Sequence, residues 1–93
     1  MAQLFDTIRR LVSEGRYVVG EHAAQRLEDR GILEWQVVDG IDGATLDRER
    51  PDASPNATVE LLQTLPDGAP VKVVWSHLRT VDAAKLVTVH YLR

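Results

Sequence analysis

The spacing of apolar residues changes once along this chain. Up to about residue 43 they recur every three or four positions, which is the period of an α-helix with one buried face. From Ala44 onward they alternate with polar residues, which is the period of a β-strand with one buried face. Because the helices come first and the strands follow as a meander, this order predicts an α+β fold. We expect N-terminal helices packed on one face of a small antiparallel sheet.

Three helices are predicted, at residues 2–14, 21–30 and roughly 34–41. Each is followed closely by glycine, which commonly ends a helix. Residues 17–19 form a short extended link or strand between the first two helices. In the third helix Trp35 and Val38 give the expected apolar stripe, with Ile41 as a further candidate. We therefore expect Trp35 to be a core residue.

Strands are predicted at residues 44–49, 57–64, 70–77 and 85–92. Alternation in the third of these places Trp75 in the core and His77 at its rim, where a hydrogen bond would satisfy the imidazole. The last strand is expected to direct one set of side chains to one face and a second set to the other. The first set is Val87, Val89 and Tyr91, and the second is Leu86, Thr88, His90 and Leu92.

The chain has 93 residues, which suits one domain covering 1–93. The core of so small a domain is modest, so a partner or a homodimer would add stability without being required. The absence of cysteine excludes a disulfide framework, a cysteine nucleophile and a thiolate metal site. The sequence has neither a run of about 18 apolar residues nor a signal-peptide pattern. We therefore expect a soluble, cytoplasmic protein without a membrane segment.

The formal net charge of −3 is unusual for a protein that binds nucleic acid through its backbone. The charge is unevenly distributed, however. Residues 31–68 hold Arg48 and Arg50 against eight acidic residues, whereas residues 69–93 carry four basic residues and one acid. Residues 1–30 are balanced. A local basic surface built from the two ends of the chain is therefore compatible with the sequence.

His22, Arg26 and Arg30 are spaced four residues apart in the second predicted helix, so they follow one stripe of its surface. An imidazole beside two guanidinium groups can bind a phosphate and transfer a proton. The alternative is structural, since Glu28 or Asp29 can pair with an arginine at little net gain. A basic residue in the last helical turn, such as Arg30, is also favourable against the helix dipole.

The other chemical motifs are weak. His22, His77 and His90 have no local spacing typical of zinc ligands, so we expect no metal site. No glycine-rich phosphate loop and no serine-nucleophile motif is present, so no cofactor is predicted. His90 and Thr88 share one face of the last strand, where a polar pair can equally be a solvated surface.

Two segments resemble a family of small bacterial domains, domain of unknown function family 4258. The first is His22-Ala23-Ala24-Gln25-Arg26-Leu27-Glu28-Asp29-Arg30-Gly31-Ile32, similar to the family's pattern H-A-x-x-R-x-x-x-R-G-I. The second is Val87-Thr88-Val89-His90-Tyr91, similar to its closing strand V-x-T-V-Y. The resemblance runs from about residue 17 to residue 93, although segment 44–65 shows no matching pattern.

This resemblance implies a fold similar to the RelE/BrnT-like toxins, within the wider barnase–EndoU–colicin–RelE group of ribonucleases. Members of that group cleave RNA on a sheet face without a metal, often paired with an antitoxin protein. On the matching positions, the resemblance implies a site formed by His22, Arg26, Arg30 and Thr88. RNA and an antitoxin-like protein are the partners that it implies.

A ribonuclease of this kind would use His22 as acid or base, while Arg26 and Arg30 hold the scissile phosphate. Thr88 and His90 would orient the substrate or carry the second proton. The alternative is a non-catalytic interaction or regulatory module of the same fold. In such a module His22, Arg26 and Arg30 form a structural network or contact an acidic partner.

Overall fold

The computed structural model describes residues 3–92, and it has the α+β composition that the change of period predicts. The helices are α1 (Gln3–Ser13), α2 (Glu21–Arg30) and α3 (Glu34–Asp39), and the last continues into a short 3-10 helix, η1 (Gly40–Gly43). The strands are β1 (Tyr17–Val19), β2 (Thr45–Arg50), β3 (Ala57–Thr64), β4 (Pro70–Leu78) and β5 (Ala83–Tyr91). The predicted first helix began at residue 2, which lies outside the described residues. No helix within 3–92 is long and apolar enough to cross a membrane.

The five strands form one sheet in the order β1-β5-β4-β3-β2. The pairs β2–β3, β3–β4 and β4–β5 are antiparallel, as the meander predicts. The expectation of a wholly antiparallel sheet is wrong, because β1 pairs with β5 in parallel. Nothing in the sequence of so short a segment indicates which strand it pairs with or in which direction. Its parallel pairing is therefore decided by packing against the edge of β5.

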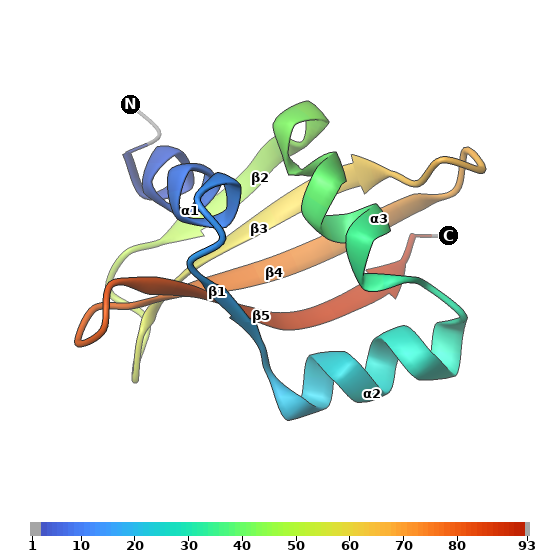
Figure 1. Cartoon of the computed structure of the whole chain (residues 1–93). Coiled ribbons are helices and arrows are strands. Elements are labelled where there is room, and N and C mark those ends of the chain that lie inside the picture. Colours follow the sequence, from blue (N-terminus) through green and yellow to red (C-terminus); the bar gives the residue numbers. More distant parts are fainter. Residues whose placement is uncertain (1–2, 93) are drawn as a thin grey trace.

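The helices are distributed over one face and one edge of the sheet (Figure 1). α1 and α3 cover one face, which we call the covered face. α2 lies instead beyond the edge of β5, where the short β1 ends. The expectation that all helices pack on one face therefore holds for α1 and α3 but not for α2. Within the described residues no helix covers the opposite face, which we call the open face.

The core lies between the covered face and the helices. Its members include Trp75, which is fully buried as predicted, and whose ring meets that of Tyr17 edge to face at 6.1 Å between centroids. Trp35, in contrast, is 53% exposed, so the prediction of a core residue is wrong. The short α3 turns Val37 and Ile41 into the core instead. These two are four positions apart in the sequence, so they occupy one helical face from which Trp35 is excluded.

A β-bulge in β5 changes which of its side chains are buried. Val74 pairs with Thr88 and Trp75 pairs with Leu86, so Val87 has no partner in β4. The extra residue reverses the alternation at this point. Leu86 and Val89 therefore both lie fully buried on the covered face, and the prediction that Leu86 shares a face with Thr88 and His90 is wrong. The prediction that Val87 shares a face with Val89 is wrong for the same reason.

Candidate functional site

The candidate site begins on α2, whose ends agree with the predicted limits. Gly31 follows the helix in the left-handed conformation (φ 66°), and its N–H bonds back to the carbonyl of Glu28. Ala23 and Leu27 are buried against the rest of the protein. Next to this buried face, on one flank of the helix, Arg26 and Arg30 are half-buried and His22 is exposed. On the other flank Ala24 and Glu28 are exposed.

The structure brings His22 and Arg26 together. The Nε–H of Arg26 donates to Nε2 of His22 over 3.5 Å, a long hydrogen bond. A ring nitrogen that accepts a hydrogen bond cannot itself carry a proton, so this contact requires the neutral imidazole to carry its proton on Nδ1. Arg26 also lies 3.5 Å from a carboxylate oxygen of Asp29, an exposed ion pair of the kind that contributes little to stability. The guanidinium therefore stays accessible beside the imidazole, whose one unprotonated nitrogen it contacts.

Arg30 is tied to the sheet through its backbone rather than its side chain. The hydroxyl of Tyr91 donates to the carbonyl oxygen of Arg30 over 3.2 Å, which joins the end of β5 to the end of α2. Within residues 3–92 the guanidinium of Arg30 has no hydrogen bond or ion pair. The charge is consequently available to a ligand.

Thr88 and His90 are half-buried on β5, downstream of the bulge. Thr88 pairs with Val74 and His90 with Lys72 across β4. Since Val71 and Val73 are buried on the covered face, the alternating Lys72 and Val74 point to the open face. Cross-strand partners share a face, so Thr88 and His90 point there too. Among the described residues no hydrogen bond joins either of them to His22, Arg26 or Arg30.

Sequence reasoning missed an ion network on the open face. Lys72 lies 3.2 Å from a carboxylate oxygen of Asp47 and 3.4 Å from one of Glu60, and Arg50 lies 2.9 Å from the other oxygen of Glu60. The hydrogen bond from Arg50 lowers the pKa of Glu60, and the bond to Asp47 raises the pKa of Lys72. These residues come from three strands, and their proximity follows only from the strand register. The network neutralises most of the charge on Lys72, next to His90.

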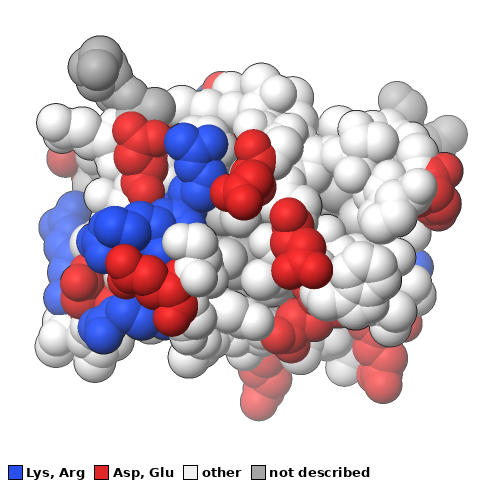
Figure 2. Space-filling view, turned by 45° about the horizontal axis from the view of Figure 1, so that its top comes forward, with Lys and Arg blue, Asp and Glu red and all other residues white. Residues whose placement is uncertain are grey.

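The basic residues of the N-terminal part are also largely paired. Arg9 bonds Asp6 and Arg10 bonds Glu14, each over 3.3 Å, while Arg16 donates to the carbonyl oxygens of Val81 and Asp82. Figure 2 shows basic side chains interleaved with acidic ones at the end of the molecule where α1 lies. This region consequently offers a mixed surface and not a uniformly basic one.

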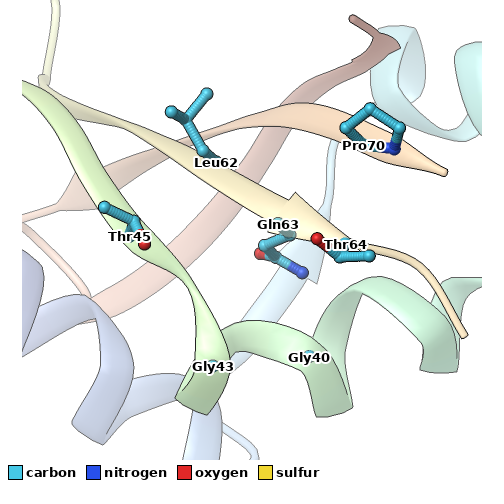
Figure 3. Close-up of a pocket in the computed structure, with 7 residues that line it drawn as sticks. All are labelled: Gly40, Gly43, Thr45, Leu62, Gln63, Thr64 and Pro70. Atoms are coloured by element: carbon cyan, nitrogen blue, oxygen red, sulfur yellow. The ribbon is translucent and has the colours of Figure 1, made fainter. Parts of the chain in front are cut away.

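A hollow of about 400 Å³ lies away from this site, between η1 and the ends of β2 and β3. Figure 3 shows Gln63 reaching from β3 toward the backbone of Gly40 and Gly43. Gln63 is buried, and its amide N–H donates to the carbonyl of Val37 over 3.2 Å. The hollow contains no titratable group, so we regard Gln63 as a structural connection between α3 and the sheet.

His77 is a rim histidine as predicted, mostly buried, with Nε2 3.0 Å from a carboxylate oxygen of Asp82. In the part of the chain that the structure describes, no group of three or more His, Cys, Asp or Glu residues is arranged to hold a metal ion.

A family described as Domain of unknown function (DUF4258) matches residues 19–91. The chain belongs to this family. The DUF4258 match includes α2 and β5, and with them His22, Arg26, Arg30, Thr88 and His90. It leaves α1 outside. Comparisons with curated proteins and with solved structures give no match.

Proposed function

We propose that this DUF4258 protein is a metal-independent ribonuclease that resembles the RelE/BrnT-like toxins and acts on RNA phosphodiesters. The observation that carries the proposal is the contact between Nε2 of His22 and Nε of Arg26, 3.5 Å apart on the accessible flank of α2. A proton-accepting group and a phosphate-binding group thereby occupy one small surface. Cleavage of RNA requires this pair of properties.

The proposed reaction uses the ribose 2′-hydroxyl as nucleophile. As the guanidinium of Arg26 turns to the phosphate, its Nε–H leaves Nε2 of His22, and the freed lone pair takes the proton of this hydroxyl while the oxygen attacks the adjacent phosphorus. Arg26 and Arg30 balance the negative charge that develops on the phosphorane oxygens. The bond to the 5′-oxygen then breaks, and His90 in its protonated form supplies the proton to this leaving oxygen, while Thr88 orients the substrate. The products are a 2′,3′-cyclic phosphate and a 5′-hydroxyl end.

Support for joining α2 to Thr88 and His90 comes from the handedness of the helix. In Figure 1 α2 runs beside β5 in the same direction as that strand, with the covered face toward the viewer. With Ala23 and Leu27 turned to the core, right-handed winding directs the flank of Arg26 and Arg30 toward the open face. Thr88 and His90 point to the same face. One strand of RNA along the junction of α2 and β5 could therefore reach both sets of side chains.

The decisive experiment is cleavage of a mixed RNA pool by the purified protein in the presence of a chelator. We expect fragments with cyclic-phosphate ends, and a loss of about 10²–10⁴-fold in rate for His22→Ala, the range typical of a general acid or base. His22 is exposed, so the melting temperature of this variant should stay within a few degrees. His77→Ala is the matched control, because it removes an imidazole at the β4–β5 turn. Its cleavage rate should equal that of the wild type.

A second candidate function is favoured by one exposed apolar pair. Leu33 and Trp35, just beyond the end of α2, are 56% and 53% exposed. Tryptophan is enriched at the centres of protein interfaces, so this pair is suited to contact an antitoxin-like protein partner. Intact RNA after incubation with clean protein, together with normal growth of cells that express it, would exclude the ribonuclease and favour this interaction module.

A further inference from the structure

A second hollow lies on the open face, beneath the loop between β2 and β3. Its volume is about 280 Å³. Loop residues 54–56 form one wall, and the floor is formed by Thr58 of β3, Ser76 of β4, and Lys85 with Val87 of β5. The hydrogen bond from Arg79 to the carbonyl of Pro51, 3.0 Å long, ties this loop to the segment that follows β4. This bond therefore helps to hold the loop over this end of the sheet.

Three polar side chains cross the floor in one row. Thr58 pairs with Ser76 across β3 and β4, and Ser76 pairs with Lys85 across β4 and β5. Paired residues point to the same face of a sheet at a spacing of about 5 Å. The side chains of Thr58, Ser76 and Lys85 therefore line a single hollow.

Ser76 is the most buried member of this row, at 4% exposure. Within the described part of the chain its hydroxyl makes no hydrogen bond to another residue. In this same part of the chain, the buried polar side-chain atoms without a partner are Gln63 Oε1 and Trp75 Nε1, so the Ser76 oxygen is not itself sealed in the core and opens to the hollow. Because Ser76 lines the hollow, a bound acceptor there would satisfy its hydroxyl.

Lys85 supplies a charge that the protein does not neutralise. Among residues 3–92 it forms no ion pair, in contrast to Lys72 on the same face, which is held by Asp47 and Glu60. Its stem lies against Gly20, where an added Cβ would come within 2.8 Å of the Lys85 Cε. Because Gly20 has no side chain, it leaves room for the Lys85 side chain. No acidic residue lines the hollow.

We propose that this hollow is a binding site for the phosphate group of a small phosphate monoester. The hydroxyls of Thr58 and Ser76 donate to the phosphate oxygens, and Lys85 balances their charge. Pro55 and Val87 offer apolar walls for the organic part of the ligand. The volume lies near the lower end of small-molecule sites, about 300–1,000 Å³. This site is separate from the His22 and Arg26 pair and does not depend on ribonuclease activity.

The test is an amide NMR titration of the full chain with phenyl phosphate and, in parallel, with inorganic phosphate. We expect saturable shifts at Thr58, Ser76 and Lys85, with phenyl phosphate binding more tightly because of the apolar walls. Ser76→Ala and Lys85→Gln should each raise the dissociation constant by about tenfold or more. Lys85→Arg should retain binding. Arg48→Gln, which removes an exposed charge from β2 outside the hollow, is the matched control and should bind like the wild type.

Two results would overturn the proposal. One is the absence of shifts on the floor of the hollow at about 10 mM phenyl phosphate, a concentration well above a dissociation constant of about 1 mM. The other is an equal loss of affinity in Arg48→Gln and Lys85→Gln, which would indicate non-specific attraction to surface charge. Since Lys85 is only half-buried, Lys85→Gln should fold, and its spectrum reports this directly.

Discussion

At the scale of single residues, Arg26 carries the contacts on which the proposed chemistry depends. It bonds His22 and Asp29, both over 3.5 Å, and its side chain is 38% exposed. Contacts this long and this exposed contribute little to folding. The planar, bidentate shape of a guanidinium matters instead for a phosphate ligand, which a lysine ammonium meets only as a point charge. Stability and activity should therefore respond differently to the same substitution.

Replacement of either arginine by lysine should separate these effects. We expect Arg26→Lys and Arg30→Lys to lower RNA cleavage by tenfold or more, while weak, salt-sensitive RNA binding remains. The free energy of unfolding should change by no more than about 0.5 kcal/mol. Cleavage assays and thermal melts on the same protein preparations check this. A loss of stability of about 1–3 kcal/mol in either variant, without cleavage to lose, would indicate a structural network instead.

At the scale of the elements, the ion network on the open face links β2, β3 and β4. Glu60 lies at its centre, with a side chain that is 17% exposed. Its pKa is lowered mainly by the hydrogen bond from Arg50, so the folded state holds this carboxyl ionised more strongly than the unfolded state does. Such a group stabilises the fold above its unfolded pKa, and the contribution is lost as the pH falls through the folded pKa.

Glu60→Gln should therefore destabilise the protein in a pH-dependent manner. Near pH 7 we expect the variant to lose about 1 kcal/mol, the scale of a surface ion pair. The difference from the wild type should shrink over the pH range from about 5 down through the lowered folded pKa of Glu60, and vanish below that range. Denaturant unfolding of both proteins across this range measures it. A difference that is constant with pH would mean that side-chain packing, and not charge, makes Glu60 favourable.

The two glycines of η1 allow a matched test of how this element contacts β3. A Cβ on Gly40 would lie 2.8 Å from the amide nitrogen of Gln63, whereas a Cβ on Gly43 would meet nothing within 4 Å. Gly40→Ala should displace Gln63 and break its bond to Val37, at a cost of about 1–3 kcal/mol. Gly43→Ala should change stability by less than about 0.5 kcal/mol. Equal melting temperatures for the two variants would contradict the role assigned to Gln63.

At the scale of the whole molecule, the folding unit is larger than the DUF4258 match. The match begins at residue 19, yet α1 buries Phe5, Ile8, Leu11 and Val12 against the sheet. The N–H of Phe5 also donates to the Glu49 carboxylate over 2.9 Å, which joins the start of α1 to β2. A helix of 11 residues has little stability alone, so α1 depends on its packing against the sheet. The covered face of the sheet in turn depends on α1 to shield it from water.

Removal of residues 1–15 should abolish cooperative unfolding. The deletion exposes the covered face that α1 shields, and the remaining core is too small to compensate. As a milder variant, Leu11→Ala should cost about 2–5 kcal/mol, because Leu11 is fully buried. Tryptophan fluorescence during urea unfolding reports both, since Trp75 lies in the same core. A cooperative transition in the deleted protein would show that the DUF4258 match folds on its own.

The candidate site was predictable only in part. The spacing of His22, Arg26 and Arg30 on a helix follows from a local rule, and the contact between His22 and Arg26 agrees with it. The faces of β5 were not predictable, because a bulge at Val87 depends on the pairing of that strand with β4. Thr88 and His90 share the open face, as expected, while Leu86 turned out to be buried in the core. Ser76 and Lys85 carried no motif, since their alignment exists only across paired strands.

Local pattern by itself determined the helices, the β2–β5 meander, the end of α2 at Gly31 and the burial of Trp75. These depend on periodicity and on the backbone freedom of glycine, which act over a few neighbouring residues. Tertiary structure alone decided the parallel pairing of β1, the place of α2 beyond the sheet edge and the exposure of Trp35. It also decided the bond between Phe5 and Glu49, which are 44 residues apart. Such features depend on which surfaces meet when the core closes, and no short window of sequence contains that information.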